Sequence, residues 1–475
     1  MAADIKRSIG MPLGELATPR KRPVITLVII AVNIAVYAVT TYGNFFLEVA
    51  DYWVVAGGFI PSLIATPSQW YRIFSSMFLH ADFFHILFNM YFLYIFGKAV
   101  EEALGGLRFL ILYTVSGVAA SVFHTAFSFL GGATYYAVPA IGASGAISGV
   151  LGAYLILFPG TSLFMGFWLL PFFFFRLKAS YYLIFWFATQ LIYGFATASG
   201  STAVFAHAGG FVAGIALLII VVNRERIRQF RMARQVGFFL YPTFVSVKTG
   251  GLSRTTKAVV AVLLALLLAG AVYASIGLPN QGEVKSTTIQ YALDGKSYVD
   301  YVGIQLSEDV ESQISSVSLD ETRILLSRLQ AFVLLYNASR VDETVHLENV
   351  SREVPIIVKI VTPPLVVYVN TTVNSFYGKY DSEGFLEFSE GSLTTRMLQF
   401  RIIGGKLYYA QSDPVTYNFE IASQTVNLNV ITQCTGVPSI FATVVALAVT
   451  VKKDKDLALI GEETETLRHP FNPFP

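Results

Sequence analysis

The sequence predicts an all-α polytopic membrane core followed by a C-terminal α+β domain. Of its 475 residues, 54% are hydrophobic and 13% are charged, and this charged share is about half that of a typical soluble domain. Nearly all the long apolar runs lie in residues 1–280, whereas residues 281–475 alternate Val, Thr and Tyr with polar residues. The single cysteine, Cys434, excludes an intrachain disulfide and a multi-cysteine metal site.

Six apolar segments precede residue 225, and each is long enough to cross a bilayer, which takes about 20 residues. They are residues 24–40, 84–103, 109–129, 142–158, 181–198 and 204–222. Residues 163–175 are also apolar, but Pro171 interrupts them, so we interpret them as a connection that lies against the membrane. A seventh span is predicted at residues 258–277.

Basic residues set the predicted orientation, because short cytoplasmic loops are enriched in Lys and Arg. The linker at residues 226–257 is strongly basic and is expected to be cytoplasmic. An even number of spans before it makes residues 1–22 cytoplasmic as well. Their polar sequence leads straight into a full-length span, so no cleavable signal peptide is evident. The prediction is a multi-pass protein of the cell membrane, with residues 281–475 outside the cytoplasm.

The C-terminal domain, residues 281–475, is expected to combine strands and a helix, and its role is unknown. Asp294-Gly295 predicts a tight hairpin, and Ser318 with Glu321 is typical of the start of a helix. Residues 440–451 could be a strand or an eighth span. We interpret them as a strand, because the run is short for a crossing and alternates larger with smaller side chains. Further strands are expected at residues 356–361, 398–403, 407–410 and 426–431.

Two runs of small residues, 140–149 and 206–214, carry Ser144 and His207. Small residues let helices pack closely in lipid, so the two side chains could meet. A neutral imidazole can remove the proton of a serine hydroxyl and make it a nucleophile. Neither position has an Asp or Glu nearby, which favours a dyad over a triad. The alternative is structural: His207 as a hydrogen bond between helices, and Ser144 as a packing residue.

His85 and Asn89 are four residues apart and therefore share one helical face. Both side chains can donate a hydrogen bond to an oxyanion, and so can the N–H of Ser144 in the first turn of its helix. The alternative for Asn89 is a hydrogen bond between helices. Glu101 is expected at the opposite, inner end of the same span and is interpreted as structural.

Five motifs in this order resemble those of the rhomboid intramembrane serine proteases. They are Trp70-Tyr71-Arg72, His80-x4-His85-x3-Asn89, Gly97-x3-Glu101-x3-Gly105, Gly142-Ala-Ser144-Gly and Ala206-His207-x-x-Gly210-x-x-x-Gly214. The resemblance covers about residues 20–225 and implies a six-helix core, residues 23–225, around a water-filled cavity open to the outside.

The resemblance also implies roles for individual residues. Ser144 would be the nucleophile and His207 the general base, with His85, Asn89 and the Ser144 N–H as the oxyanion hole. His80 and Arg72 would support the first external loop, and Glu101 would help to fix that region. The fifth span, with Trp186 and Gln190, would be the lateral entry for substrate. Ser148 departs from family members that carry an aromatic residue there against the histidine.

The expected function is an endopeptidase that cleaves transmembrane segments of membrane proteins, with no metal, no cofactor and no nucleic-acid partner. The lipid bilayer and transmembrane substrates are the expected partners, and the sequence leaves the oligomeric state open. A competing hypothesis is a non-catalytic rhomboid-like protein that binds membrane clients. A transporter is disfavoured, because the sequence shows no internal repeat or pair of broken helices.

Overall fold

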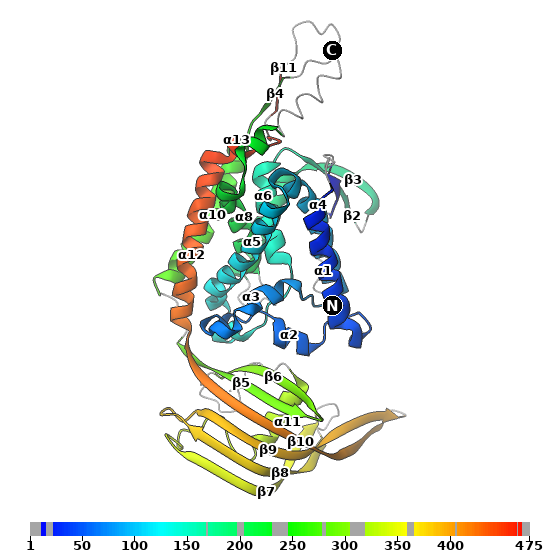
Figure 1. The fold of residues 1–475 in the computed structure, drawn as a ribbon, viewed down its shortest axis with the longest axis vertical. Coiled ribbons are helices and arrows are strands. Elements are labelled where there is room, and N and C mark those ends of the chain that lie inside the picture. Colours follow the sequence, from blue (N-terminus) through cyan, green and yellow to red (C-terminus); the bar gives the residue numbers. More distant parts are fainter. Residues whose placement is uncertain are drawn as a thin grey trace. The chain divides into compact units, whose positions relative to one another are not determined.

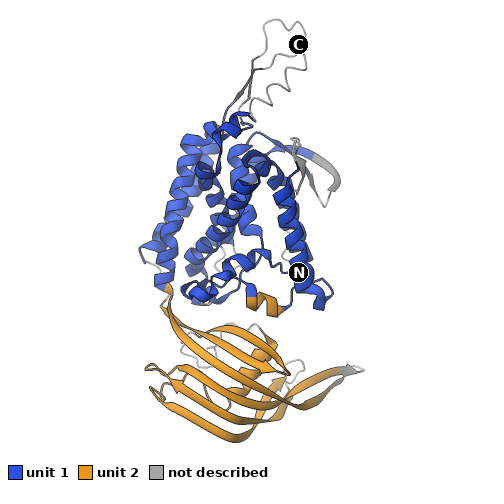
Figure 2. Cartoon of the chain, in the orientation of Figure 1, with its two compact units in different colours: residues 1–50, 57–281, 429–475 blue, residues 51–56, 282–428 orange. Residues whose placement is uncertain are grey.

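The computed structural model describes residues 11–15, 22–167, 170–196, 204–229, 246–277, 282–304, 319–358, 365–403, 406–462 and 464–467. The chain divides into two compact units (Figure 2). Unit 1 comprises residues 1–50, 57–281 and 429–475, and unit 2 comprises residues 51–56 and 282–428.

Unit 1 is a bundle of helices (Figure 1). Its main helices are α1 (Val24–Thr41), α4 (Phe83–Leu104), α5 (Gly106–Phe127), α6 (Ser144–Leu157), α7 (Ala179–Ala196), α8 (Val204–Val221), α10 (Arg254–Ser275) and α12 (Leu428–Ala448, whose first residue ends unit 2). The first seven lie at the predicted spans. Within the described residues, six helices are long and apolar enough to cross a membrane: α1, α4, α5, α8, α10 and α12.

Helix α6 lies at the centre of unit 1, because every residue from 145 to 157 is buried. Its small residues let α8 approach closely, as the sequence predicted. A Cβ atom on Gly210 would lie 1.9 Å from the carbonyl oxygen of Gly145, and one on Gly214 would lie 1.9 Å from that of Gly149. Any larger side chain at Gly210 or Gly214 would therefore push the two helices apart.

Short elements join the first helices at the end of the bundle where α4 and α6 begin. Between α1 and α4 lie η2 (Tyr42–Asn44), α2 (Asp51–Gly57), η3 (Pro61–Ala65), η4 (Pro67–Gln69), α3 (Tyr71–Ser75) and η5 (Ser76–Phe78). The loop before α6 contains η6 (Ser128–Gly131) and η7 (Ala133–Ala137). Phe59 and Ala140 exchange backbone hydrogen bonds of 2.9 and 2.7 Å, which join the two connections.

The apolar connection at residues 163–175 is a β-hairpin and does not cross the bundle as a helix. Strand β2 (Ser162–Phe167) pairs with β3 (Leu170–Lys178) and with β1 (Met11–Glu15) in a three-stranded antiparallel sheet. Leu163 and Met165 are buried whereas Phe164 is exposed, so the run follows the two-residue period of a strand. Beyond α10 and α12, β4 (Ser246–Thr249) pairs with β11 (Thr464–Leu467).

The interpretation of residues 440–451 as a strand is wrong, because they belong to α12 and its continuation to α13 (Asp454–Leu457). The predicted strand at 426–431 likewise ends at Asn427. The hydroxyls of Thr435, Ser439 and Thr443 recur every four residues, and each bonds the backbone carbonyl four residues earlier. That spacing puts them on one buried helical side, and the apolar stretch is long enough to cross a membrane.

Helix α12 packs antiparallel to α10, so residues 429–475 belong to unit 1 and not to the C-terminal domain predicted at 281–475. At one end of the pair, a Cβ atom on Gly436 would lie 2.4 Å from the hydroxyl of Ser275. At the other end, Lys257 forms an ion pair of 2.7 Å with the buried Asp454. Glu462 accepts a hydrogen bond of 2.8 Å from the Thr256 hydroxyl.

Unit 2 is built on a six-stranded antiparallel sheet in the order β6-β5-β10-β9-β8-β7. The strands are β5 (Glu283–Leu293), β6 (Lys296–Ile304), β7 (Thr344–Val358), β8 (Leu365–Tyr380), β9 (Leu386–Ile403) and β10 (Lys406–Asn427). The predicted hairpin at Asp294-Gly295 is present, with Leu293 opposite Lys296. The predicted helix is α11 (Asp320–Leu329), which starts after Leu319; Ser318 lies outside the described residues.

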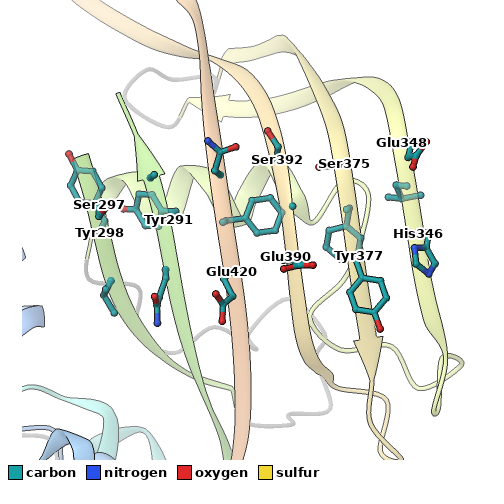
Figure 3. A pocket seen from close by; sticks show the side chains of 18 residues that line it. Tyr291, Ser297, Tyr298, His346, Glu348, Ser375, Tyr377, Glu390, Ser392 and Glu420 are labelled. Carbon is teal, nitrogen blue, oxygen red and sulfur yellow. The ribbon is translucent and has the colours of Figure 1, made fainter. Parts of the chain in front are cut away.

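One face of this sheet packs on α11, and the other is hollowed. On the packed face, the Thr322 hydroxyl donates to the hydroxyl of Tyr291, whose strand partner is Phe419. The next residues along each strand point the opposite way. Figure 3 shows that side, where Glu420, Glu390 and neighbouring polar side chains line a shallow hollow across all six strands. The C-terminal domain is thus α+β, as predicted.

Candidate active site

Ser144 and His207 meet where two central helices begin. Ser144 is the first residue of α6, and His207 lies in the first turn of α8. The Ser144 Oγ and the His207 Nε2 are 2.8 Å apart, and both residues are only partly buried. The close packing of α6 on α8 at their glycines holds these helix starts side by side. A hydroxyl and an imidazole nitrogen at this distance can exchange a proton.

The other nitrogen of the His207 ring has a partner on α7. Nδ1 lies 2.9 Å from the side-chain carbonyl oxygen of Gln190. Because a carbonyl oxygen only accepts, Nδ1 carries the proton and Nε2 is free to accept from Ser144. The ring of Trp186, one turn earlier on α7, lies 6.1 Å from the His207 ring at an angle of 37°. On α6, the Ser148 hydroxyl donates to the backbone carbonyl of Ser144 at 2.6 Å.

These contacts of α7 are what sequence reasoning missed, since it connected Trp186 and Gln190 only with substrate entry. The sequence has no carboxylate near the histidine, and the third group is instead the uncharged side chain of Gln190. The available signal was the four-residue spacing of Trp186 and Gln190, which places both on one helical face.

His85 presents a hydrogen-bond donor toward the turn before Ser144. The Ala81 N–H donates to His85 Nδ1 at 3.3 Å, so the ring proton is on Nε2. A Cβ atom on Gly142 would lie 2.7 Å from His85 Nε2 and 3.6 Å from Ser144 Oγ. Gly142 thus separates the imidazole from the hydroxyl, and its φ of +123° is open to glycine. The N–H of Ser144 has no intrahelical acceptor, because it opens α6.

Asn89 lies one turn further along α4, and it is buried. Its side-chain amide donates to the carbonyl of His85 at 2.9 Å. An amide nitrogen carries two hydrogens, so this bond leaves one for another acceptor. Asn89 therefore keeps one donor one turn along α4 from His85, whose Nε2–H lies beside Gly142 and Ser144.

His80 holds the turn before Ser144 in place. The Ala143 N–H donates to His80 Nε2 at 3.4 Å, and His80 Nδ1 lies 3.3 Å from the Phe78 carbonyl oxygen. Burial, followed by the nearby His85, lowers the pKa of His80 to about 3. The ring consequently stays neutral near pH 7, as it must to accept from a backbone N–H.

Arg72 is buried and ties together parts of the connection between α1 and α4. Its Nε donates to the side chain of Gln69 at 2.7 Å, and its Nη1 donates to the Gly58 carbonyl at 3.0 Å. These contacts join Gln69 and Gly58, two parts of that connection, through one side chain.

Glu101 does not contact that connection, which corrects the role implied for it. Its carboxylate accepts from the backbone N–H groups of Ile25 and Thr26 at 2.9 and 2.8 Å and from the Thr26 hydroxyl at 2.7 Å. It therefore caps the start of α1, where unpaired N–H groups attract negative charge. Glu101 is sixteen residues beyond His85 in α4, or about 24 Å at the rise of a helix. It therefore lies at the other end of the bundle, where the interpretation of Glu101 as a structural residue expected it.

Known proteins are similar to the part of the chain that carries this site. A family model described as a rhomboid domain matches residues 67–224. The chain is 34% identical over 140 residues to the rhomboid protease GluP of Bacillus subtilis, a match that covers 28% of this chain and 24% of GluP. It is 28% identical over 160 residues to the rhomboid protease AarA of Providencia stuartii, covering 32% of this chain and 54% of AarA.

A match to RHOMBOID-like protein 1 of Arabidopsis thaliana has 30% identity over 170 residues, and covers 36% of this chain and 39% of the relative. The chain thus spans about a quarter to a half of the length of these relatives. The matched stretch contains α4 to α8, which carry Ser144 and His207, whereas α10, α12 and unit 2 lie outside it. The chain is a multi-pass membrane protein with a rhomboid domain at residues 67–224.

Proposed function

We propose that this chain is an intramembrane serine endopeptidase that cleaves transmembrane segments of other membrane proteins. The observation that carries the proposal is the 2.8 Å contact between Ser144 Oγ and His207 Nε2 at the starts of two central helices. The match to the rhomboid domain supports it, because two of the relatives described above are named proteases.

In the first half of the reaction, Ser144 Oγ attacks the scissile carbonyl carbon while its proton passes to His207 Nε2. The negative charge that develops on the carbonyl oxygen is stabilised by the Ser144 N–H, His85 Nε2–H and the Asn89 amide. The C–N bond then breaks, and the imidazolium returns the proton to the leaving amine. The serine remains as an ester of the new carboxyl terminus.

In the second half, a water molecule attacks that ester and gives its proton to His207 Nε2. The same three donors stabilise the second oxyanion. Collapse releases the carboxyl product, and Ser144 Oγ recovers its proton from the imidazolium. Every proton is returned, so the cycle uses only the peptide bond and water.

The proposed topology places the N-terminus in the cytoplasm and the active site and the strands of unit 2 on the other side of the cell membrane. Helix α12 then returns the chain to the cytoplasm. Supporting this, Lys452, Lys453 and Lys455 lie at the end of α12 that packs beside the start of α10 with its Arg254 and Lys257. Basic residues at one end of both helices are typical of a cytoplasmic side.

The topology can be tested with single cysteines, because Cys434 is the only one in the sequence. In a Cys434→Ser background, Lys296→Cys in unit 2 is expected to react with a membrane-impermeant maleimide in intact cells. Arg228→Cys, exposed after α8, is expected to react only once the membrane is permeabilised. The reverse pattern would overturn the orientation.

The function can be tested with the full chain in proteoliposomes that contain a tagged single-span substrate. The wild type is expected to cleave the substrate and to react covalently with a fluorophosphonate probe, with the label mapped to the peptide that contains Ser144. Labelling at a different serine would overturn the assigned nucleophile. Neither cleavage of several substrates nor labelling would instead favour a client-binding protein.

A further inference from the structure

We infer that Gln190 is the positioning residue of His207, so that the orientation of the histidine is set from helix α7. The inference rests on the proposed function, because a general base needs the tautomer that leaves its Nε2 free to accept the serine proton. It adds a third, uncharged member to the Ser144–His207 pair.

The hydrogen bond to Gln190 decides which nitrogen of His207 can work as a base. With the proton on Nδ1, held at 2.9 Å by the Gln190 carbonyl oxygen, Nε2 faces Ser144 with a free lone pair. With the proton on Nε2, the ring could not take the serine proton. Within the described residues, Nδ1 donates to the side-chain oxygen of Gln190.

Helix α7 also supplies the aromatic contact of the His207 ring. Trp186 lies against the ring from one turn before Gln190, so both supports come from one helical face. Helix α6 offers a small residue, Ser148, whose hydroxyl is turned to the Ser144 carbonyl. The histidine is therefore oriented by α7, and α6 contributes the nucleophile.

The position of Gln190 depends on how α7 packs on α8. The buried rings of Phe187 and Phe211 stack with centroids 4.5 Å apart. Nearer the end of α7, a Cβ atom on Gly194 would lie 2.8 Å from the ring of Phe205. These contacts fix the distance between the helices around the Gln190–His207 bond.

A displacement of α7 would therefore act on the chemistry. A shift of about 1 Å takes a hydrogen bond of this length beyond the range in which it is effective. The base would then lose its fixed tautomer while Ser144 stays in place. Only a conformation with α7 packed on α8 has a competent base.

The test compares Gln190→Leu, Gln190→Glu and Ile192→Ala with the wild type in proteoliposomes. Ile192 is on the same helix and largely exposed, so it controls for changes in α7 itself. Gln190→Leu removes the acceptor and is expected to lower kcat about tenfold, with little change in KM. Thermal unfolding verifies that each variant is folded.

Gln190→Glu keeps an acceptor and adds a negative charge beside the imidazole. An adjacent carboxylate favours the imidazolium, so the acidic limb of the pH–kcat profile is expected to move up by about one pH unit. Activity above that limb is expected to be retained. A residue 190 that did not contact the imidazole would not move this limb, so Gln190→Glu tests the contact even if Gln190→Leu fails to fold.

Wild-type kcat in Gln190→Leu together with an unmoved acidic limb in Gln190→Glu would overturn the inference while leaving the proposed function intact. A wild type that neither cleaves substrate nor reacts with the fluorophosphonate would overturn both. A fall in kcat of the same size in Ile192→Ala would also count against Gln190, since the effect would then belong to α7 as a whole.

Discussion

Removal of either member of the Ser144–His207 pair is expected to lower kcat/KM for a transmembrane substrate by about 10⁴-fold or more. Ser144→Ala leaves no nucleophile within reach of the 2.8 Å contact, and His207→Ala leaves a hydroxyl whose proton has no acceptor there. The double variant is expected to be no worse than either single variant, because the two groups act in one step. Initial rates of cleavage in proteoliposomes measure all three.

Fluorophosphonate labelling should disappear in both single variants, since the probe needs the nucleophile and its base. Additive losses in the double variant would mean that the two residues contribute separately, as two packing residues would. Thermal unfolding of each variant serves as the control, because removal of a partly buried hydroxyl or imidazole should leave the bundle folded.

Gly142→Ala is expected to lower kcat by about 10²-fold or more, which is the size of effect that follows from loss of one oxyanion donor. The new Cβ would lie 2.7 Å from His85 Nε2, closer than real contacts allow, so the imidazole must move. The φ of +123° at this position adds strain for any residue with a side chain. Single-turnover cleavage would measure the loss.

The chain offers a matched control for this change. Gly132 also has a positive φ, +78°, but a Cβ atom there would meet nothing within 4 Å. Gly132→Ala therefore carries backbone strain without a collision and is expected to keep wild-type kcat. Equal losses in the two variants would show that strain in the connection, and not the place of His85, limits the reaction.

The sequence predicted the helices that position Ser144 and His207, because their apolar length and small residues are local properties. Gly210 and Gly214 indicated a close helix contact, and the contact brings the two side chains together. The support of His207 could not be predicted in the same way. The spacing of Trp186 and Gln190 indicates that they share a helical face, but it does not encode the depth of α7 relative to α8, on which the contact with His207 depends.

The same limit explains the error at residues 440–451. Alternation of large and small residues there indicated a strand, whereas the regular Thr and Ser spacing belonged to a helix that packs on α10. Where this helix continues into α13, Asp454 pairs with Lys257, nearly 200 residues earlier. A pattern within a few neighbouring residues cannot predict such a contact. The hairpin at Asp294-Gly295 was predictable because both of its strands are neighbours in sequence.

The two ends of residues 282–428 lie next to each other in the sheet of unit 2. Glu283 at the start of β5 is the ladder partner of Asn427 at the end of β10, and the Leu428 N–H bonds the Gly282 carbonyl at 3.2 Å. The first and last residues of this segment of unit 2 are thus one strand spacing apart, about 5 Å. Residues 282–428 therefore begin and end at adjacent positions, which is the geometry that lets a domain be inserted within a longer chain.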